Sequence, residues 1–352
     1  MRIEAETKLD FDDVLIRPKR STLASRSNVD LYRTYTFLNS KQIYTGIPLI
    51  ASNMNTVGTI GAALALQQYH ILTCFHKFIN YDEVKEYENK ASKSELWFDW
   101  FAITLGEDFK IENQSYLPVV KYLLLDAANG YREEFVDAVK RIKGAFSHHS
   151  PVIIAGNVVT PEMTEQLLLA GADIVKVGIG SGGQCTTRLK TGVGYPQLSA
   201  IIECADAAHG LKGHIAADGG CRVPGDICKA FAAGADFVML GSMLAAHNEN
   251  TAKKDIERDL HGFYTHTYGM SSTTAQEKFY GGVAKHRSSE GKTTKLYMRG
   301  SINETIDDIL GALRSCCTYV GAQSLKELSK RTTFILVNQQ RNTFYDEQQV
   351  SD

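Results

Sequence analysis

The chain has 352 residues, of which 43% are hydrophobic and 22% charged, and its formal net charge is −2. This composition supplies a sizeable core, and it offers neither a basic stripe for nucleic acid nor the apolar run of about 20 residues that a membrane span needs. The first residues contain no apolar signal-peptide region, so we expect a soluble, cytoplasmic protein. The seven cysteines lack the spacing of a disulfide framework, and most are expected to be buried free thiols.

Eight short apolar runs recur along the chain, each followed by a turn signal and, in most cases, a helix-like stretch. They are rich in β-branched residues, as expected for parallel strands that are buried on both faces. The runs cover 47–52, 71–75, 101–104, 122–126, 152–156, 173–177, 214–218 and 236–240. Eight strands that alternate with helices predict an α/β fold, a (β/α)₈ TIM barrel, with a doubly wound open sheet as the alternative.

The clearest helices lie between the later runs. Thr160 can cap a helix over 161–170, Pro161 suits its first turn, and Gly171 follows its end. A helix over 224–233 repeats this design, and 197–209 is a further amphipathic stretch. We therefore expect one catalytic domain over 1–352, with a polar lid-like insertion at about 249–301 after the eighth strand and a polar tail from about 331.

The loop after the sixth run, GIGSGGQCTTR at 178–188, is the most informative segment. Glycine can take positive φ, so such a loop can bend sharply and bring its backbone close to a ligand. Cys185 is the candidate nucleophile, Arg188 a group that can lower its pKa, and Thr187 a proton relay. The carbonyl groups near Gly180 and Gly182 can hold a monovalent cation. An incidental cysteine in a flexible connection is the alternative interpretation.

Further candidates follow other strands or lie in the insertion. The seventh and eighth runs end at Asp218-Gly219-Gly220 and Gly241-Ser242, where barrels often bind phosphate. These residues predict a nucleotide ligand, and ordinary turn residues without a ligand are the alternative. The motif YGMSS at 268–272 suits a purine base or, equally, an exposed turn. Glu290 is either a catalytic carboxylate or a solvated surface charge, and Lys77 either meets a phosphate or faces water.

The strings GIGSGGQCTTRLKTGVGYPQLSA, DGG, YGMSS and EGKT together resemble the IMP dehydrogenase/GMP reductase family. The resemblance extends from LDFDDVLIRPKRSTLASRS near the start to LKELSKRTTFI near the end. Dehydrogenases of this family usually carry a CBS-domain pair after the second strand, YRGMGS in place of YGMSS, and an Arg-Tyr pair on a flap. None of these is found in this sequence, so the resemblance favours the reductase branch.

The resemblance implies the NADPH-dependent reductive deamination of GMP to IMP with release of ammonia. In that reaction Cys185 forms a thioimidate at C2 of the purine, and Thr187 and Glu290 help ammonia to depart. It also implies a bound potassium ion and a homotetramer in which the cofactor site is shared between subunits. The alternatives are an IMP dehydrogenase-like oxidoreductase, an enzyme acting on a related purine nucleotide, and a non-catalytic purine-nucleotide-binding homologue.

The resemblance also implies which positions bind each ligand. The implied GMP contacts are Asp218, Gly219, Gly220, Gly241, Ser242, Gly269, Met270, Ser271, Arg287, Ser288, Ser289 and Gly291. The implied NADPH contacts are Lys77, Ala128, Asn129, Gly130, Ile179, Gly180, Met270, His286, Arg287, Ser315, Cys316, Cys317 and Thr318, with Ser25 and Arg26 reaching the cofactor of an adjacent subunit. The implied potassium ligands are at Gly180, Gly182, Cys185 and Arg188.

The chain departs from the family pattern at several positions. Ser181, Gly183 and Gln184 stand where the family usually has GIGPGSxC, and losing that proline removes a constraint on φ. Asn55 replaces an aspartate, Ala217 replaces a serine, and Lys285-His286 replaces a Glu-Tyr pair beside the cofactor.

Overall fold

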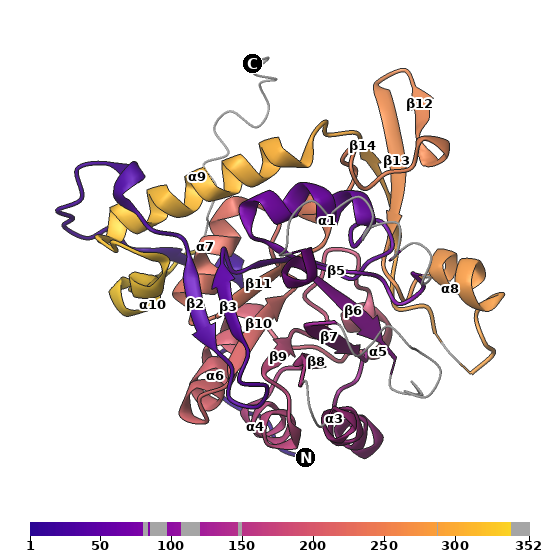
Figure 1. Cartoon of the computed structure of the whole chain (residues 1–352), viewed down its shortest axis with the longest axis horizontal. Helices are drawn as coiled ribbons and strands as arrows, with labels where there is room; N and C mark the ends of the chain where they lie inside the picture. Colours follow the sequence, from indigo (N-terminus) through magenta and orange to yellow (C-terminus); the bar gives the residue numbers. More distant parts are fainter. Residues whose placement is uncertain (80–83, 85–96, 107–119, 147–149, 287, 339–352) are drawn as a thin grey trace.

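A computed structural model of the chain describes residues 1–79, 84, 97–106, 120–146, 150–286 and 288–338 (Figure 1). At its centre eight parallel strands form a closed barrel, because the last strand, β11, pairs with the first, β4. The strands are β4 (Leu49–Ala51), β5 (Leu72–Cys74), β6 (Phe101–Leu105), β7 (Tyr122–Asp126), β8 (Val152–Val158), β9 (Ile174–Val177), β10 (His214–Asp218) and β11 (Phe237–Leu240). Each overlaps one of the eight predicted runs, and β6 and β8 extend one and two residues beyond theirs. The predicted barrel is confirmed, and the open-sheet alternative is wrong.

Side chains alternate between the interior of the barrel and the layer between strands and helices. Ile50, for example, packs in the interior cluster, whereas its neighbours Leu49 and Ala51 belong to the outer cluster. This alternation follows from the two-residue period of a strand. Because both faces are buried, the strands must be apolar throughout, which is why the sequence shows them as continuous runs.

An antiparallel hairpin closes one end of the barrel. Its strands are β2 (Arg33–Thr36) and β3 (Ile43–Gly46), and the rings of Tyr35 and Tyr44 pack on Phe237, the first residue of β11, with centroid distances of 5.0 and 5.1 Å. This plug lies at the amino ends of the barrel strands. The opposite end, where the strands lead into their loops, is therefore the open one, as is usual for the active end of this fold.

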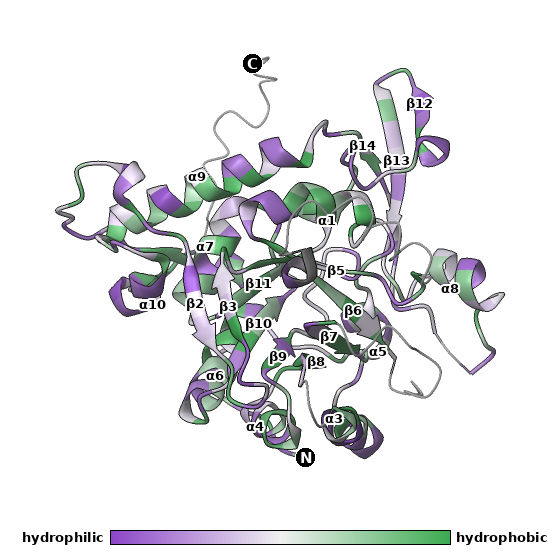
Figure 2. Cartoon of the chain, viewed as in Figure 1, coloured by the Kyte–Doolittle hydropathy of each residue, from purple (hydrophilic) through white to green (hydrophobic). Residues whose placement is uncertain are grey.

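The helices cover the barrel and end close to the predicted positions. They are α1 (Ile60–Leu66), α3 (Glu133–Ala145), α4 (Pro161–Ala170), α5 (Thr187–Thr191), α6 (Gln197–Gly210), α7 (Pro224–Ala232), α8 (Thr273–Tyr280), α9 (Ile302–Val320) and α10 (Leu328–Arg331). Helix α4 has the predicted bounds, and Gly171 ends it in the left-handed conformation. In Figure 2 the strands β10 and β11 are mostly green, whereas α9 alternates between green and purple, as an amphipathic helix does.

The segment predicted as a lid-like insertion forms regular structure of its own. It contains an antiparallel sheet of β12 (Glu257–Asp259), β13 (Gly262–Tyr268) and β14 (Thr293–Tyr297), together with α8, and stands beside the barrel in Figure 1. The first residues of the predicted polar tail form a strand, β15 (Phe334–Leu336), which pairs with β1 (Val14–Ile16) of the same chain. Residues 339–352 of that tail lie outside the described residues. Within the described part of the chain, no helix combines the length and apolar character that crossing a bilayer demands.

Candidate active site

The candidate nucleophile lies in the loop that joins β9 to α5, at the open end of the barrel. The N–H of Cys185 donates to the carbonyl of Gly182 at 3.0 Å, which forms a tight turn, and the thiol is half-buried. Gly180 has a φ of 78°, so this loop uses the left-handed conformation that glycine tolerates best. A side chain at Gly178 would lie 2.0 Å from the carbonyl of Asp218, so the start of the loop also packs tightly on the end of β10.

A chain of hydrogen bonds connects the thiol to a carboxylate. The Sγ of Cys185 donates to Oγ1 of Thr187 at 3.1 Å, and that hydroxyl donates to Oε2 of Glu290 at 2.7 Å. Two consecutive hydrogen bonds therefore connect the three side chains of the predicted catalytic set. A thiol, a hydroxyl and a carboxylate arranged in this order can pass a proton from sulfur to oxygen and back.

The lid segment that carries Glu290 is held on the cysteine loop by backbone hydrogen bonds. The carbonyl of Glu290 accepts from Thr186 N–H at 2.8 Å, and the carbonyl of Gln184 accepts from Lys292 N–H at 2.9 Å. The N–H of Glu290 in turn donates to the carbonyl of Ser271 at 3.2 Å. Glu290 is thus fixed on both sides and is half-buried, so it is not the solvated surface charge of the alternative interpretation.

Arg188 does not occupy the position expected of a group that activates the thiol. Its guanidinium donates to Oδ2 of Asp10 at 3.0 Å and to the carbonyl of Tyr195 at 2.6 Å. Arg188 is exposed, and a Cβ at Gly180 would lie 2.7 Å from Cγ of its stem. Within the described part of the chain the guanidinium makes no hydrogen bond to the thiol, whose partner is the hydroxyl of Thr187.

The loops after β10 and β11 meet the cysteine loop. Gly219 has a φ of 95°, and a Cβ there would lie 2.6 Å from Oγ of Ser181 and 2.9 Å from the backbone nitrogen of Gly182. A Cβ at Gly183 would lie 3.8 Å from Oγ of Ser242, which begins the turn after Gly241. Gly220 packs beside Phe11. Three loops with accessible backbone therefore converge at one place.

The other positions implied for GMP come from the lid. A Cβ at Gly269 would lie 3.2 Å from the carbonyl of Gln184 and 3.5 Å from Cα of Gly291, so these segments adjoin the cysteine loop. Sδ of Met270 accepts from Asn55 N–H at 3.5 Å, which ties the lid to the loop after β4. Ser289 donates to the carbonyls of Ser271 and Gly291, and Ser288 is exposed. Arg287 lies outside the described residues.

The positions implied for NADPH form two separate groups. The first surrounds the open end of the barrel: Nζ of Lys77 lies 5.2 Å from the ring centroid of Phe78, which stacks at 3.8 Å on Phe279 of α8. A Cβ at Gly130 would lie 2.7 Å from the carbonyl of Asn157, so the loop after β7 packs closely on the loop after β8. The remaining members of this group are Ala128, Asn129 and His286, which are exposed, and Ile179, Gly180 and Met270, which are half-buried.

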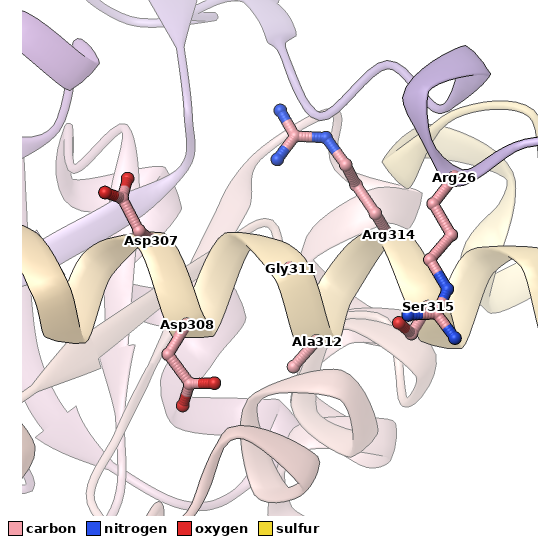
Figure 3. A pocket seen from close by; sticks show the side chains of 7 residues that line it. All are labelled: Arg26, Asp307, Asp308, Gly311, Ala312, Arg314 and Ser315. Atoms are coloured by element: carbon pink, nitrogen blue, oxygen red, sulfur yellow. The ribbon is translucent and has the colours of Figure 1, made fainter.

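The second group lies at the carboxyl end of α9, on the other side of the molecule from α8 in Figure 1. A cavity of about 450 Å³ there is lined by Arg26, Ser315, Asp307, Asp308, Gly311, Ala312 and Arg314. Figure 3 shows that Arg26 reaches toward Ser315 from outside the helix. Ser25 is exposed, and Cys316 and Thr318 are half-buried, but Cys317 is fully buried in the core. The side chain of Cys317 therefore has no access to a cofactor, contrary to the expectation.

Two of the carbonyl groups implied for potassium already accept a backbone hydrogen bond. The carbonyl of Gly182 accepts from Cys185 N–H at 3.0 Å, and the carbonyl of Arg188 accepts from Gly192 N–H at 3.2 Å. A carbonyl oxygen has a second lone pair, so both can still coordinate an ion. Among the described residues, no group of three or more His, Cys, Asp or Glu could hold a metal ion, so a cation here would depend on neutral backbone oxygens. Neutral oxygen donors suit a monovalent cation.

Two charged groups of the site, Lys176 and Asp126, were not predicted from the sequence. Lys176 of β9 is buried inside the barrel, and its Nζ lies 2.6 Å from Oδ1 of Asp126 and 3.1 Å from Oδ2 of Asp218. Nδ2 of Asn157 donates to the same oxygen of Asp218 at 2.9 Å. Burial opposes the charges of Lys176 and Asp126, but their mutual attraction prevails and raises the pKa of Lys176 and lowers the pKa of Asp126. The sequence did contain a signal for this cluster, because Lys176 is a charged residue within an otherwise apolar strand.

Comparisons with known proteins agree with this architecture. The sequence profile of the IMP dehydrogenase / GMP reductase domain matches residues 8–343. The chain is 55% identical to GMP reductase 2 of Homo sapiens, over 98% of this chain and 99% of that protein. It is also 55% identical to a GMP reductase of Caenorhabditis elegans, over 98% and 96% of the two chains. Given these matches, the chain belongs to the IMP dehydrogenase / GMP reductase family.

Proposed function

We propose that this protein is an oxidoreductase that converts GMP, NADPH and a proton to IMP, NADP⁺ and ammonia. The observation that carries the proposal is the hydrogen-bonded sequence from the thiol of Cys185 through Thr187 to the carboxylate of Glu290, at 3.1 and 2.7 Å. The resemblance over almost the full length to proteins named GMP reductase supports the choice of substrate. The three converging glycine loops supply backbone donors for the nucleotide phosphate.

The first step is the displacement of the amino group at C2 of GMP. The thiol proton of Cys185 passes through the Thr187 hydroxyl to Glu290, and the resulting thiolate forms a bond to C2. The bond from C2 to the exocyclic nitrogen then breaks. Because ammonia leaves far more readily than an amide anion, the leaving nitrogen takes back the same proton from Glu290 through Thr187. The products are free ammonia and a thioimidate that joins Cys185 to the purine.

The second step releases IMP. NADPH, when bound, supplies a hydride to C2. The C–S bond breaks as the thiolate leaves. Glu290, which ended the first step without a proton, takes one from solvent and passes it through the Thr187 hydroxyl to the sulfur, which restores the starting thiol and carboxylate. Lys77 and the loop 128–130 lie at the open end of the barrel, where they can hold the cofactor beside the cysteine loop.

The proposal includes a homotetramer, a potassium ion and a cytoplasmic location. The two groups of cofactor positions support the oligomer, since residues at the carboxyl end of α9 and residues beside α8 lie on opposite sides of one chain. A neighbouring copy could bring Arg26 to the open end of the barrel. The potassium site rests on the carbonyls of Gly180, Gly182, Cys185 and Arg188, and it predicts higher activity in potassium salts than in choline salts.

The decisive experiment follows NADPH absorbance in the purified protein after addition of GMP, with chromatographic detection of IMP. We expect oxidation of NADPH that requires GMP, and we expect Cys185→Ala to abolish it. Reaction of IMP with NAD⁺ in place of this activity would support the dehydrogenase-like alternative. Calorimetric binding of GMP with no turnover, and no change on Cys185→Ala, would support the non-catalytic alternative.

A further inference from the structure

Four polar side chains form a connected cluster inside the barrel, one from each of four neighbouring strands. They are Asp126 at the end of β7, Asn157 of β8, Lys176 of β9 and Asp218 at the end of β10. The side chain of Lys176 is only 4% exposed, and its ammonium contacts both carboxylates. Such a charge is rarely buried without a reason, because its desolvation is costly even when it is paired.

The cluster gives Asp218 a defined orientation. Among the described residues, Lys176 and Asn157 both donate to the same oxygen of Asp218, Oδ2, at 3.1 and 2.9 Å. Oδ1 is therefore left to accept hydrogen bonds from a ligand. The backbone carbonyl of Asp218 accepts from Ser181 of the cysteine loop at 3.2 Å, so the same residue also touches the loop that carries the nucleophile.

The same ammonium reaches the cofactor side of the site. Asp126 precedes the loop 128–130, and its contact with Lys176 is the shorter of the two, at 2.6 Å. One cation thus balances two carboxylates that lie at the ends of β7 and β10. Because one ammonium contacts both carboxylates, a change at Lys176 alters the surroundings of both.

We propose that Lys176 is a positioning residue that fixes the Asp218 carboxylate for the ribose hydroxyl pair of the purine nucleotide. It acts by holding Oδ2 of Asp218, which leaves Oδ1 to accept from the ribose hydroxyls. The inference rests on the proposed function, because it takes the nucleotide ribose as the partner of Asp218. A purely structural ion pair would stabilise the barrel without regard to the ribose.

The test compares Lys176→Met with a matched control, Lys229→Met. Lys229 is a second buried lysine, but its ammonium donates to the carbonyl of Phe11 at 2.9 Å on the outside of the barrel. The kcat/KM of each variant is measured with GMP and with 2′,3′-dideoxy-GMP, which lacks the hydroxyl pair. We expect Lys176→Met to lower kcat/KM for GMP by about 10- to 100-fold, the range for a hydrogen bond to a charged group, and to change the value for the dideoxy nucleotide less than about threefold.

Lys229→Met should affect the two nucleotides equally. Equal losses with both nucleotides in Lys176→Met, or no loss with GMP, would overturn the inference. If Lys176→Met does not fold, Lys176→Arg keeps the charge in a different shape, and it should raise KM for GMP more than it lowers kcat. Calorimetric affinities for the same two nucleotides make the comparison independent of turnover, so a wild-type protein that binds GMP without oxidising NADPH would refute the proposed function and still test this inference.

Discussion

Replacing Thr187 with valine removes the hydroxyl that links sulfur to carboxylate while keeping nearly the same side-chain shape. The hydroxyl accepts from Cys185 at 3.1 Å and donates to Glu290 at 2.7 Å, so the substitution breaks both hydrogen bonds at once. The thiol then loses its path for the outgoing proton, and the departing amine loses its source of one. Both losses fall on the step that forms the thioimidate.

The expected effect follows from the usual contribution of general acid–base catalysis, a factor of about 10² to 10⁴ in rate. We therefore expect kcat of Thr187→Val to fall by that factor, which corresponds to about 3–5 kcal/mol in the activation free energy. The affinity for GMP should change much less, because the phosphate is proposed to bind at the glycine loops around Gly219 and Ser242, which do not depend on this hydroxyl.

The assay is steady-state oxidation of NADPH with GMP, combined with mass spectrometry of the protein quenched during turnover. Thr187→Ser keeps a hydroxyl and should retain kcat within about tenfold. Thr191→Val is the matched control, since Thr191 lies in the same short helix. Its hydroxyl donates to the carbonyl of Thr187 at 2.8 Å and accepts from Val193 N–H at 3.0 Å, so it takes no part in the relay. A Thr187→Val protein with wild-type kcat, or one that accumulates the cysteine adduct as fast as wild type, would show that the relay does not operate.

Three further predictions concern other parts of the site. Cys185→Ala should abolish turnover but keep the GMP affinity within roughly tenfold by calorimetry, because the phosphate contacts lie elsewhere; residual turnover would refute a covalent step. Gly219→Ala should raise KM for GMP about tenfold, since its Cβ would lie 2.6 Å from Ser181 Oγ at a φ of 95°, and an unchanged KM would contradict the converging loops. Burial and the nearby Lys278 ammonium lower the pKa of His76 from 6.5 to about 4, so its contribution to stability is complete above pH 6.5 and is lost as pH falls toward 4. His76→Gln should remove an acid-side loss on the order of 3 kcal/mol in urea unfolding, and an unaltered pH slope would refute this assignment.

The sequence by itself determined the elements of the barrel and the position of the candidate nucleophile. Each strand is apolar along its whole length because both faces are buried, and this local pattern is visible without any knowledge of the partner strands. Helix α4 was predicted to the residue, since Pro161 and Gly171 mark its two ends chemically. The glycines of the cysteine loop likewise predict a sharp bend before Cys185.

Only the tertiary structure decided which polar and charged side chains lie in contact. Thr187 and Glu290 are 103 residues apart in the chain, and Arg188 pairs with Asp10 from 178 residues away. The interpretation of Arg188 as a group that activates the thiol relied on proximity in sequence, but its guanidinium donates to Asp10 instead. Lys176 is the clearest case. The sequence shows a lysine in an apolar strand, but only the side-by-side packing of β7 to β10 in the barrel places the carboxylates of Asp126 and Asp218 around its ammonium.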